Sequence, residues 1–302
     1  MTSRDKEPSM GAQFQYEEAF ARNLGWVTPE EQQRLRGKRV AIAGMGGVGS
    51  GYLLTLARLG IGAFHIADFD CYDIPNLNRQ AASFMSTMGQ PKVAAAARMA
   101  QDINPQIEIR QFGDGVNSAN VSAFLDGVDL YVDGLDFYAF DARTLVYGHC
   151  AAQRIPATMA APLGMGASCL NFLPGGMSFE DYFQWGDLPE VEKALRFLVG
   201  LAPASLHRGY LVWPQGVDLA QRRGPSTSMG CQLCAGIAGS QALKILLGRG
   251  KVLAAPHGFQ YDAYEDKYVT TWRPGGNRHP LQRLAMALAR RKFIGTTPPR
   301  TG

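Results

Sequence analysis

The sequence has little of what would mark a secreted or membrane-spanning protein. It contains 5 cysteines, an odd number, among 302 residues, so no framework of disulfides is expected. No uninterrupted apolar run reaches the roughly 18–20 residues that span a bilayer. The opening residues, MTSRDKEPSMGAQ, are polar and lack the apolar core of a signal peptide. We therefore expect a cytoplasmic protein that does not associate with a membrane.

The chain also lacks a strong charge of either sign. It has 30 Lys and Arg residues against 26 Asp and Glu residues, a net charge of +4. Much of the excess lies near the C-terminus, at Arg278, Arg283, Arg290, Arg291 and Lys292. Such a cluster can attract nucleic acid or an acidic protein, but a solvated basic helix face is the expected interpretation. Nucleic acid is therefore not the expected partner.

Strand patterns alternate with helix patterns in the first half of the chain. Short apolar runs at 39–44, 63–70, 107–113 and 129–136 are typical of buried strands, and 51–59 and 91–104 are typical of helices. Residues 14–36 are also expected to be helical, with Thr28 and Pro29 as a start signal. The alternation predicts an α/β fold with a Rossmann-like, doubly wound and mostly parallel sheet. Strands recur later in the chain and predict an added C-terminal strand and helix region.

A glycine-rich turn follows the first expected strand, in VAIAGMGGVGSGYLLTLARLG. Gly44, Gly46 and Gly49 fit G-x-G-x-x-G, and Gly47 lies between them. Glycines at this spacing allow a tight turn, close approach of a phosphate and close packing of helix on strand. The helix that follows offers free N–H groups to an anion. The turn alone does not distinguish a nucleotide site from a purely steric use of glycine.

The residues after the second strand distinguish between the possible nucleotides. Asp68 ends that strand and can accept hydrogen bonds from ribose hydroxyls, as in NAD-dependent dehydrogenases. The loop DFDCYDIPNLNRQ then adds Asp70, Asn76, Asn78, Arg79 and Gln80, and Lys92 begins the helix after Pro91. At a helix start we expect the Lys92 side chain to be exposed and to contribute little to stability. Two cations beside the phosphates suit a triphosphate better than a nicotinamide cofactor. The loop therefore favours a nucleoside triphosphate.

The glycine turn, D-x-D, N-L-x-R-Q and P-K occur in this order in the ThiF/MoeB/HesA superfamily, and residues 15–172 resemble that superfamily. Its members are relatives of ubiquitin-activating enzymes and adenylate the C-terminal carboxylate of small ubiquitin-like proteins. The resemblance implies that ATP is bound by Gly44, Gly46, Gly47, Gly49, Asp68, Asp70, Asn76, Gln80 and Lys92. It also implies that Arg79 and Lys92 act on the phosphates in catalysis.

Two further site residues follow from the same resemblance. YVDGLDFYAFDAR corresponds to the family's D-x-x-D-N stretch and makes Asp136 the expected Mg²⁺ ligand. This chain departs from the pattern, because Phe137 replaces the usual Asn and Arg143 follows Asp136 by seven residues instead of five. FARNLG resembles the element whose arginine reaches the partner subunit's triphosphate, so Arg22 is expected to act in trans within a homodimer.

The zinc site of many family members is not expected here. Tetrahedral zinc needs four protein ligands, and Cys231 with Cys234 form the chain's single C-x-x-C pair. Cys71, Cys150 and Cys169 lie elsewhere in the sequence. The pair leads into an apolar helix, so buried packing is the expected role, with zinc shared across a dimer as the alternative.

The chain is expected to divide into four stretches. Residues 1–13 form a disordered tail, and 14–172 form the ATP-binding core. Residues 173–272 complete the domain with a crossover that binds the partner, a buried helix over 235–248 and an aromatic hairpin over 259–272. Residues 273–302 form a basic amphipathic helix and tail, with Leu281, Leu284, Ala285 and Leu288 on one face.

The resemblance predicts an ATP- and Mg²⁺-dependent adenylyltransferase that activates the C-terminal carboxylate of a ubiquitin-like or carrier protein. Two alternatives stay open. One is a tRNA-modifying dehydratase of the same family, suggested by the basic C-terminal helix. The other is a nucleotide-binding scaffold without turnover, suggested by the altered Phe137 and Arg143 positions.

Overall fold

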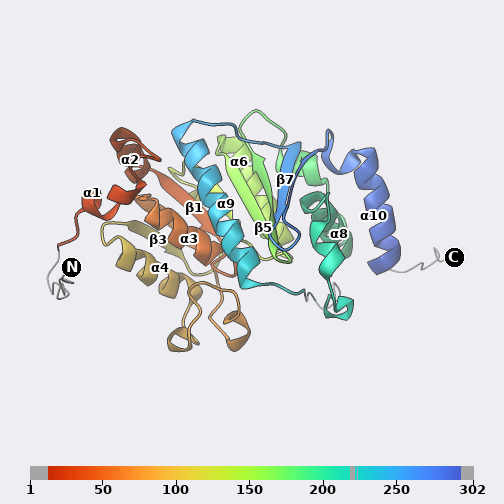
Figure 1. The fold of residues 1–302 in the computed structure, drawn as a ribbon, viewed down its shortest axis with the longest axis horizontal. Coiled ribbons are helices and arrows are strands. Elements are labelled where there is room, and N and C mark those ends of the chain that lie inside the picture. Colours follow the sequence, from red (N-terminus) through yellow and green to blue (C-terminus); the bar gives the residue numbers. More distant parts are fainter. Residues whose placement is uncertain (1–12, 218–221, 223, 294–302) are drawn as a thin grey trace, which may run out of the picture.

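The strands form one mixed sheet in the order β3-β2-β1-β4-β5-β6-β7-β8 (Figure 1). The computed structural model describes residues 13–217, 222 and 224–293, so the tail expected at residues 1–13 lies almost wholly outside the described residues. β1 to β5 pair in parallel, and the pairings from β5 to β8 are antiparallel. The bounds are β1 (Arg39–Ala43), β2 (Ala63–Ala67), β3 (Glu108–Phe112), β4 (Leu130–Asp133), β5 (Ala157–Leu163), β6 (Gly166–Phe172), β7 (His257–Asp262) and β8 (Lys267–Trp272). The predicted mostly parallel, doubly wound sheet with an added C-terminal part is confirmed.

Helices cover both faces of this sheet (Figure 1). One face carries α2 (Pro29–Arg36), α3 (Gly49–Arg58), α4 (Lys92–Ile103) and α9 (Ser228–Leu247). The other carries α5 (Val121–Phe124), α6 (Phe140–Gln153), α7 (Phe179–Phe183) and α8 (Glu190–Leu201). The short α1 (Tyr16–Ala19) precedes α2, and α10 (Pro280–Phe293) packs on α8. The sheet is therefore the middle layer of three.

The two faces of the central strands bury different side chains. Val40 and Ile42 of β1 belong to the core under α3, α4 and α9, whereas Ala41 and Ala43 belong to the core under α6 and α8. A parallel strand covered on both faces reads as a continuous apolar run. This explains why the strand patterns were easy to recognise in the sequence.

The N-terminal segment is not one helix, contrary to the prediction for 14–36. α1 ends at Ala19, a 3-10 turn spans Ala21–Asn23, and α2 begins only at Pro29. Thr28 closes a capping box with Glu31, because each side chain accepts the other's backbone N–H. The start signal was therefore right for α2, and the positive φ of Gly25 breaks the helix before it.

Helix α9 is longer than predicted and begins at Ser228 instead of residue 235. Thr227 caps it by accepting the N–H of Gly230. By length and composition α9 could cross a membrane, but a core helix passes the same test. Here it packs on β5, β6 and α3, so it serves as a core helix in this fold.

The predicted apolar face of α10 is not the face that packs inward. Leu281, Leu284 and Leu288 are 55%, 59% and 57% exposed, whereas Gln282 and Met286 are buried. Gln282 Nε2 donates to Val199 O of α8 at 3.0 Å, and Arg290 pairs with Glu192 of α8 at 2.6 Å. Polar contacts with α8 thus set the orientation of α10, which an apolar pattern cannot predict.

Candidate nucleotide site

The predicted glycine turn lies between the carboxyl end of β1 and the start of α3, the edge where parallel sheets bind ligands. Gly44 has φ of +87°. A Cβ on Gly44 would lie 2.2 Å from Gly134 O, and one on Gly49 would lie 1.7 Å from Gly44 O. Backbone atoms would occupy the space of either methyl group. Gly44 and Gly49 are therefore required by the fold itself.

The sequence interpretation missed Gly134, which follows β4 and completes this contact. A Cβ there would lie 2.7 Å from Gly44 O and 2.9 Å from Gly49 Cα. Because β4 pairs with β1, the residues that follow the two strands meet at the same edge. A glycine directly after a strand end was the available signal.

Gly46 and Gly47 stand in a different environment. For a Cβ on Gly46 the nearest atom is Gln80 Nε2 at 3.7 Å, an ordinary contact distance. A Cβ on Gly47 would meet Cys231 Sγ at 3.2 Å and Arg79 Nε at 3.7 Å. The fold therefore does not require glycine at 46, and close approach of a ligand is the remaining reason for it.

Asp68 links the glycine turn to the loop after β2. Its Oδ2 accepts the N–H of Met45 at 2.6 Å, and its Oδ1 accepts the N–H of Asp70 at 2.8 Å. Burial raises the pKa of Asp68 above its ordinary value, while both N–H donors and the Lys92 ammonium oppose that rise. A carboxylate offers about four acceptor positions, so Asp68 retains capacity for ribose hydroxyls.

Lys92 is buried, and the expectation of an exposed lysine at a helix start was wrong. Its side chain is 7% exposed, and Nζ lies 3.0 Å from Oδ2 of Asp70, which is 54% exposed. The Lys92 N–H also donates to Asp70 O at 2.9 Å. Asp70 thus orients the lysine, a role in addition to the predicted contact with ATP. A buried ammonium is costly unless paired, and Asp70 supplies that partner. An ammonium has three N–H donors, so Lys92 can also donate to an anionic ligand at this edge.

The loop between β2 and α4 brings Arg79 and Gln80 to the turn, whereas the Asn76 side chain caps its own loop. Arg79 donates to Pro75 O and to Asn78 Oδ1, and Asn76 Oδ1 accepts the N–H of Asp73. Gln80 is buried, and its Oε1 has no hydrogen-bond partner in the described part of the chain. Unpartnered buried amides are rare. Gln80 beside Gly46 therefore has unused hydrogen-bonding capacity where a ligand is expected.

Asp136 follows β4 at the same edge and is exposed. Its Oδ1 accepts the N–H of Tyr138 at 3.0 Å, and within the described residues its Oδ2 has no partner. The described chain holds no group of three or more His, Cys, Asp or Glu side chains that could hold a metal ion. A single carboxylate can still hold Mg²⁺ when phosphates complete the coordination.

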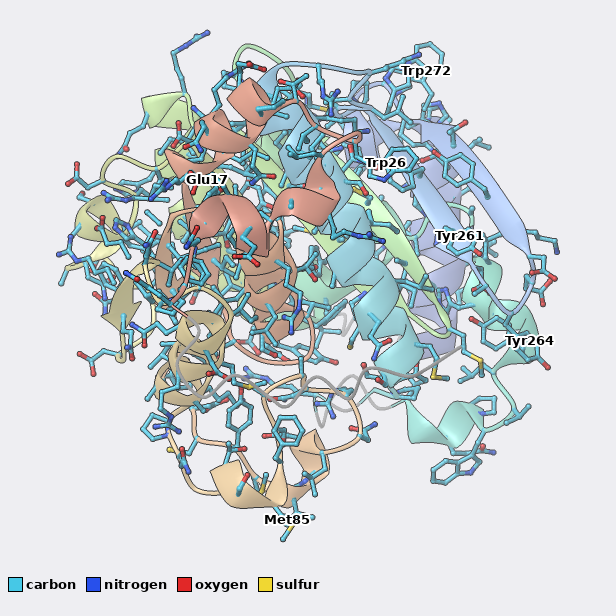
Figure 2. All side chains as sticks on the ribbon, turned by 60° about the vertical axis from the view of Figure 1, so that its left-hand side comes forward. Glu17, Trp26, Met85, Tyr261, Tyr264 and Trp272 are labelled. Atoms are coloured by element: carbon cyan, nitrogen blue, oxygen red, sulfur yellow. The ribbon has the colours of Figure 1, made fainter. Side chains whose placement is uncertain are left out.

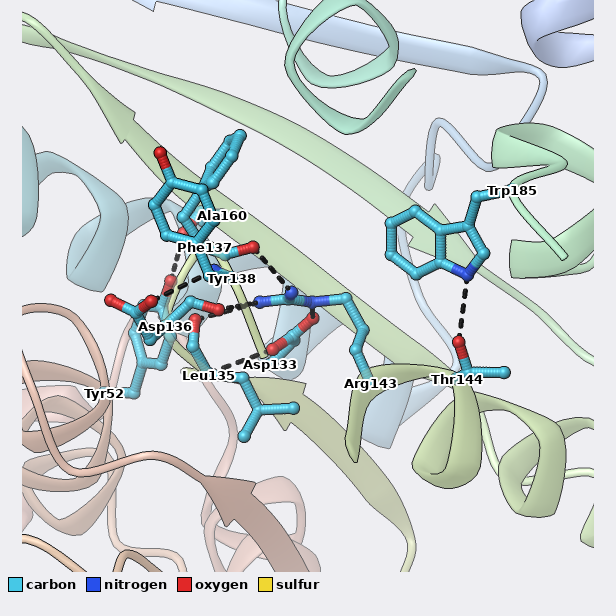
Figure 3. Close-up of polar contacts among 10 residues, drawn as sticks. All are labelled: Tyr52, Asp133, Leu135, Asp136, Phe137, Tyr138, Arg143, Thr144, Ala160 and Trp185. Atoms are coloured by element: carbon cyan, nitrogen blue, oxygen red, sulfur yellow. Dashed lines mark hydrogen bonds and ion pairs between the residues drawn. The ribbon is translucent and has the colours of Figure 1, made fainter. Parts of the chain in front are cut away.

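Arg143 lies beneath the Asp136 loop and is buried on α6 (Figure 3). Its Nε pairs with Asp133 Oδ2 at 2.8 Å, and its guanidinium donates to the carbonyls of Leu135, Asp136 and Phe137. Arg143, displaced by two residues from the family pattern, thus holds the backbone of this loop. Asp133 was missed as its partner because the two residues are ten positions apart.

Arg22 is not brought to the nucleotide site of its own chain. It is exposed in the 3-10 turn Ala21–Asn23. The neighbouring Asn23 donates to Arg58 O and Leu59 O, where α3 ends. The glycine turn lies at the opposite end of α3. A contact between Arg22 and ATP therefore requires a second subunit.

Cys231 and Cys234 are buried within the first turns of α9. Both belong to the core under α3 and α9, and burial raises the pKa of each thiol. Cys231 contacts the glycine turn at Gly47. Core packing of the pair agrees with the sequence interpretation, and the expected lack of zinc stays a prediction.

The residues expected to bind a partner, 173–272, divide between core and surface. Trp185 and Phe183 are buried, so the stretch FEDYFQW contributes mainly to the core. The β7–β8 hairpin and its turn instead carry three exposed aromatic side chains, Tyr264, Tyr268 and Trp272. Figure 2 shows Tyr264 and Trp272 at opposite ends of the hairpin. Exposed apolar residues that are scattered in this way are ordinary and do not by themselves mark a binding surface.

A glycine turn, an acidic strand end and a buried lysine at one edge of a doubly wound sheet define a nucleotide-binding α/β protein. The model of the ThiF family matches residues 20–284. The chain belongs to this family.

Two curated relatives and one solved structure illustrate the range of similarity. The SAMP-activating enzyme E1 of Haloferax volcanii is 29% identical over 244 residues, 81% of this chain and 80% of that protein. The tRNA threonylcarbamoyladenosine dehydratase of Bacillus subtilis is 34% identical over 138 residues, 45% of this chain and 54% of that protein. The crystal structure of E. coli MccB with ATP superposes with a TM-score of 0.62 at 20% identity, covering 84% of this chain and 70% of that one. At that identity the structural likeness concerns the fold alone.

Proposed function

We propose that this protein is an ATP- and Mg²⁺-dependent adenylyltransferase that activates the C-terminal carboxylate of a ubiquitin-like or carrier protein. The observation that carries the proposal is the buried Lys92, held by Asp70 beside a glycine turn with no packing reason for Gly46. Family membership and the named activity of the SAMP-activating relative, which spans most of this chain, support it. A cytoplasmic location accompanies the proposal.

The residues at this edge fit ATP. Asp68 would accept the ribose hydroxyls, and Gly46 with the start of α3 would receive the phosphates. Lys92 and Arg79 would neutralise phosphate charge, and Asn76 and Gln80 have side-chain amides available for further hydrogen bonds. Asp136 would hold Mg²⁺, which, when bound, neutralises phosphate charge and orients the triphosphate.

The proposed reaction needs little acid–base catalysis. A peptide carboxylate is ionised at pH 7 and attacks the α-phosphorus directly, forming an acyl-adenylate and releasing pyrophosphate. The barrier comes from bringing two anions together and from charge on the leaving group. Fixed cations lower that barrier electrostatically, and Lys92 and Arg79 are suited to this role.

ATP–pyrophosphate exchange tests the function directly. The purified chain is incubated with labelled pyrophosphate, ATP, Mg²⁺ and a set of carrier proteins ending in Gly. Exchange that depends on the carrier and is lost when its C-terminus is amidated supports the proposal. A chain that fails to bind ATP contradicts it.

Arg22 should act across a homodimer. Arg22→Ala and Lys92→Met are each expected to abolish most exchange, because each removes a phosphate-binding cation. Mixing equal amounts of the two variants and allowing subunits to exchange should restore about a quarter of wild-type activity. In such mixtures half the dimers are heterodimers, each with one intact site. An inactive mixture that contains verified heterodimers contradicts action in trans.

A tRNA-modifying dehydratase is the second candidate, favoured by the Bacillus subtilis relative and by exposed Arg283 and Arg291 on α10. Phosphate contacts would make tRNA binding fall steeply with salt. Filter binding at 50 and about 200 mM salt therefore separates the two functions.

ATP binding without exchange or AMP release, whatever carboxylate is offered, would instead indicate a nucleotide-binding scaffold.

A further inference from the structure

The loop between β4 and α6 carries an aromatic residue where the family pattern has Asn. Phe137 packs against Phe197 of α8, with ring centroids 5.1 Å apart, and against Phe140 of α6 at 6.2 Å. The loop is thus fixed to α8, a helix of the crossover between β6 and α9. Asp136 lies immediately before this anchor.

The same helix contacts the arginine beneath the loop. The Arg143 guanidinium carbon lies 4.5 Å from the centroid of the Phe197 ring. This guanidinium also binds the Asp133 carboxylate and three consecutive loop carbonyls (Figure 3). Phe197 therefore contacts both Phe137, a side chain of the loop, and Arg143, which holds the loop backbone.

This arrangement holds the loop backbone and leaves part of the Asp136 carboxylate unused. A buried arginine that fixes three successive carbonyls leaves the intervening backbone little freedom, while the Asp136 carboxylate projects outward with one free oxygen among the described residues. Residues that orient a metal ligand typically change metal affinity 10- to 100-fold when mutated.

We propose that Arg143 and Phe197 are positioning residues that hold Asp136 in place for Mg²⁺. Through them, α8 sets the Mg²⁺ dependence of nucleotide binding. The inference rests on the proposed function, because it takes Asp136 as the metal ligand.

The test compares Phe197→Leu with a matched control, Phe179→Leu. Phe179 belongs to the same buried aromatic cluster but packs on Tyr147, Phe172, Phe183 and Trp185 instead of on the loop. Isothermal titration calorimetry measures ATP affinity in each variant over a series of Mg²⁺ concentrations. Arg143→Lys is added as the variant closest to the metal ligand.

Phe197→Leu is expected to raise the half-saturating Mg²⁺ concentration about tenfold, and Arg143→Lys by 10- to 100-fold. ATP affinity without Mg²⁺ should stay unchanged, and Phe179→Leu should match the wild type. Equal shifts in Phe197→Leu and Phe179→Leu, or no shift in Phe197→Leu, would overturn the proposal. If Arg143→Lys does not fold, the comparison of the two leucine variants still decides. Wild-type ATP binding that ignores Mg²⁺ would instead contradict the metal site of the proposed function.

Discussion

Replacing Lys92 with methionine is expected to lower the turnover of ATP–pyrophosphate exchange by about 10²–10³-fold. A preorganised charge at a site of developing phosphate charge contributes about this much. Methionine retains most of the buried aliphatic volume and removes only the ammonium group. Asp70, which is 54% exposed, is left facing water, so the free energy of unfolding should change by less than about 1 kcal/mol. Exchange kinetics and chemical denaturation measure the two effects.

Lys193→Met is the matched control for this variant. Its side chain is 14% exposed and Nζ lies 3.4 Å from Asp141, so it is a partly buried lysine paired with an exposed carboxylate. It should leave exchange unchanged. If Lys92→Met keeps turnover within about threefold of the wild type, Lys92 does not contact the reacting phosphates.

Lys92→Ala is the less informative substitution, because Lys92 is buried. Alanine removes the stem as well as the charge, and the lost packing would lower the free energy of unfolding by about 1–2 kcal/mol. The sequence alone predicted no such loss. The burial arises from Asp70, 22 residues earlier, and from the packing of the loop that joins β2 to α4.

The parts of the site that could be predicted are those encoded locally. The glycine turn, Asp68 and Lys92 each adjoin a strand end or helix start, so periodicity and motif spacing placed them at the carboxyl edge of the sheet. β1 pairs in parallel with β2 on one side and with β4 on the other, so the carboxyl ends of these three strands lie side by side.

The parts that escaped prediction depend on contacts between distant segments. Arg143 contacts Asp133 and the loop carbonyls because α6 begins at Phe140, where the sequence pattern predicted no helix. The inward face of α10 follows from contacts with Glu192 and Val199 of α8, which lie 98 and 83 residues before their partners. Helical periodicity identifies an apolar face, but it cannot say which neighbour that face meets.

The glycines of the turn should separate folding from binding. Gly49→Ala is expected to lower the free energy of unfolding by about 3 kcal/mol or more, because its Cβ would lie 1.7 Å from Gly44 O. Backbone, not a flexible side chain, would have to move. Thermal or chemical denaturation of the protein without nucleotide measures this loss.

Gly46→Ala is expected to behave in the opposite way. Its Cβ would meet nothing closer than Gln80 Nε2 at 3.7 Å, so the free energy of unfolding should stay within about 0.5 kcal/mol of the wild type. ATP affinity should fall at least about tenfold, because the methyl group would occupy the space through which the phosphates approach the backbone. Calorimetric titration with ATP and Mg²⁺ measures this change. A Gly46→Ala protein that binds ATP as tightly as the wild type would show that the triphosphate does not lie over this turn, and the proposed site would then have to be abandoned.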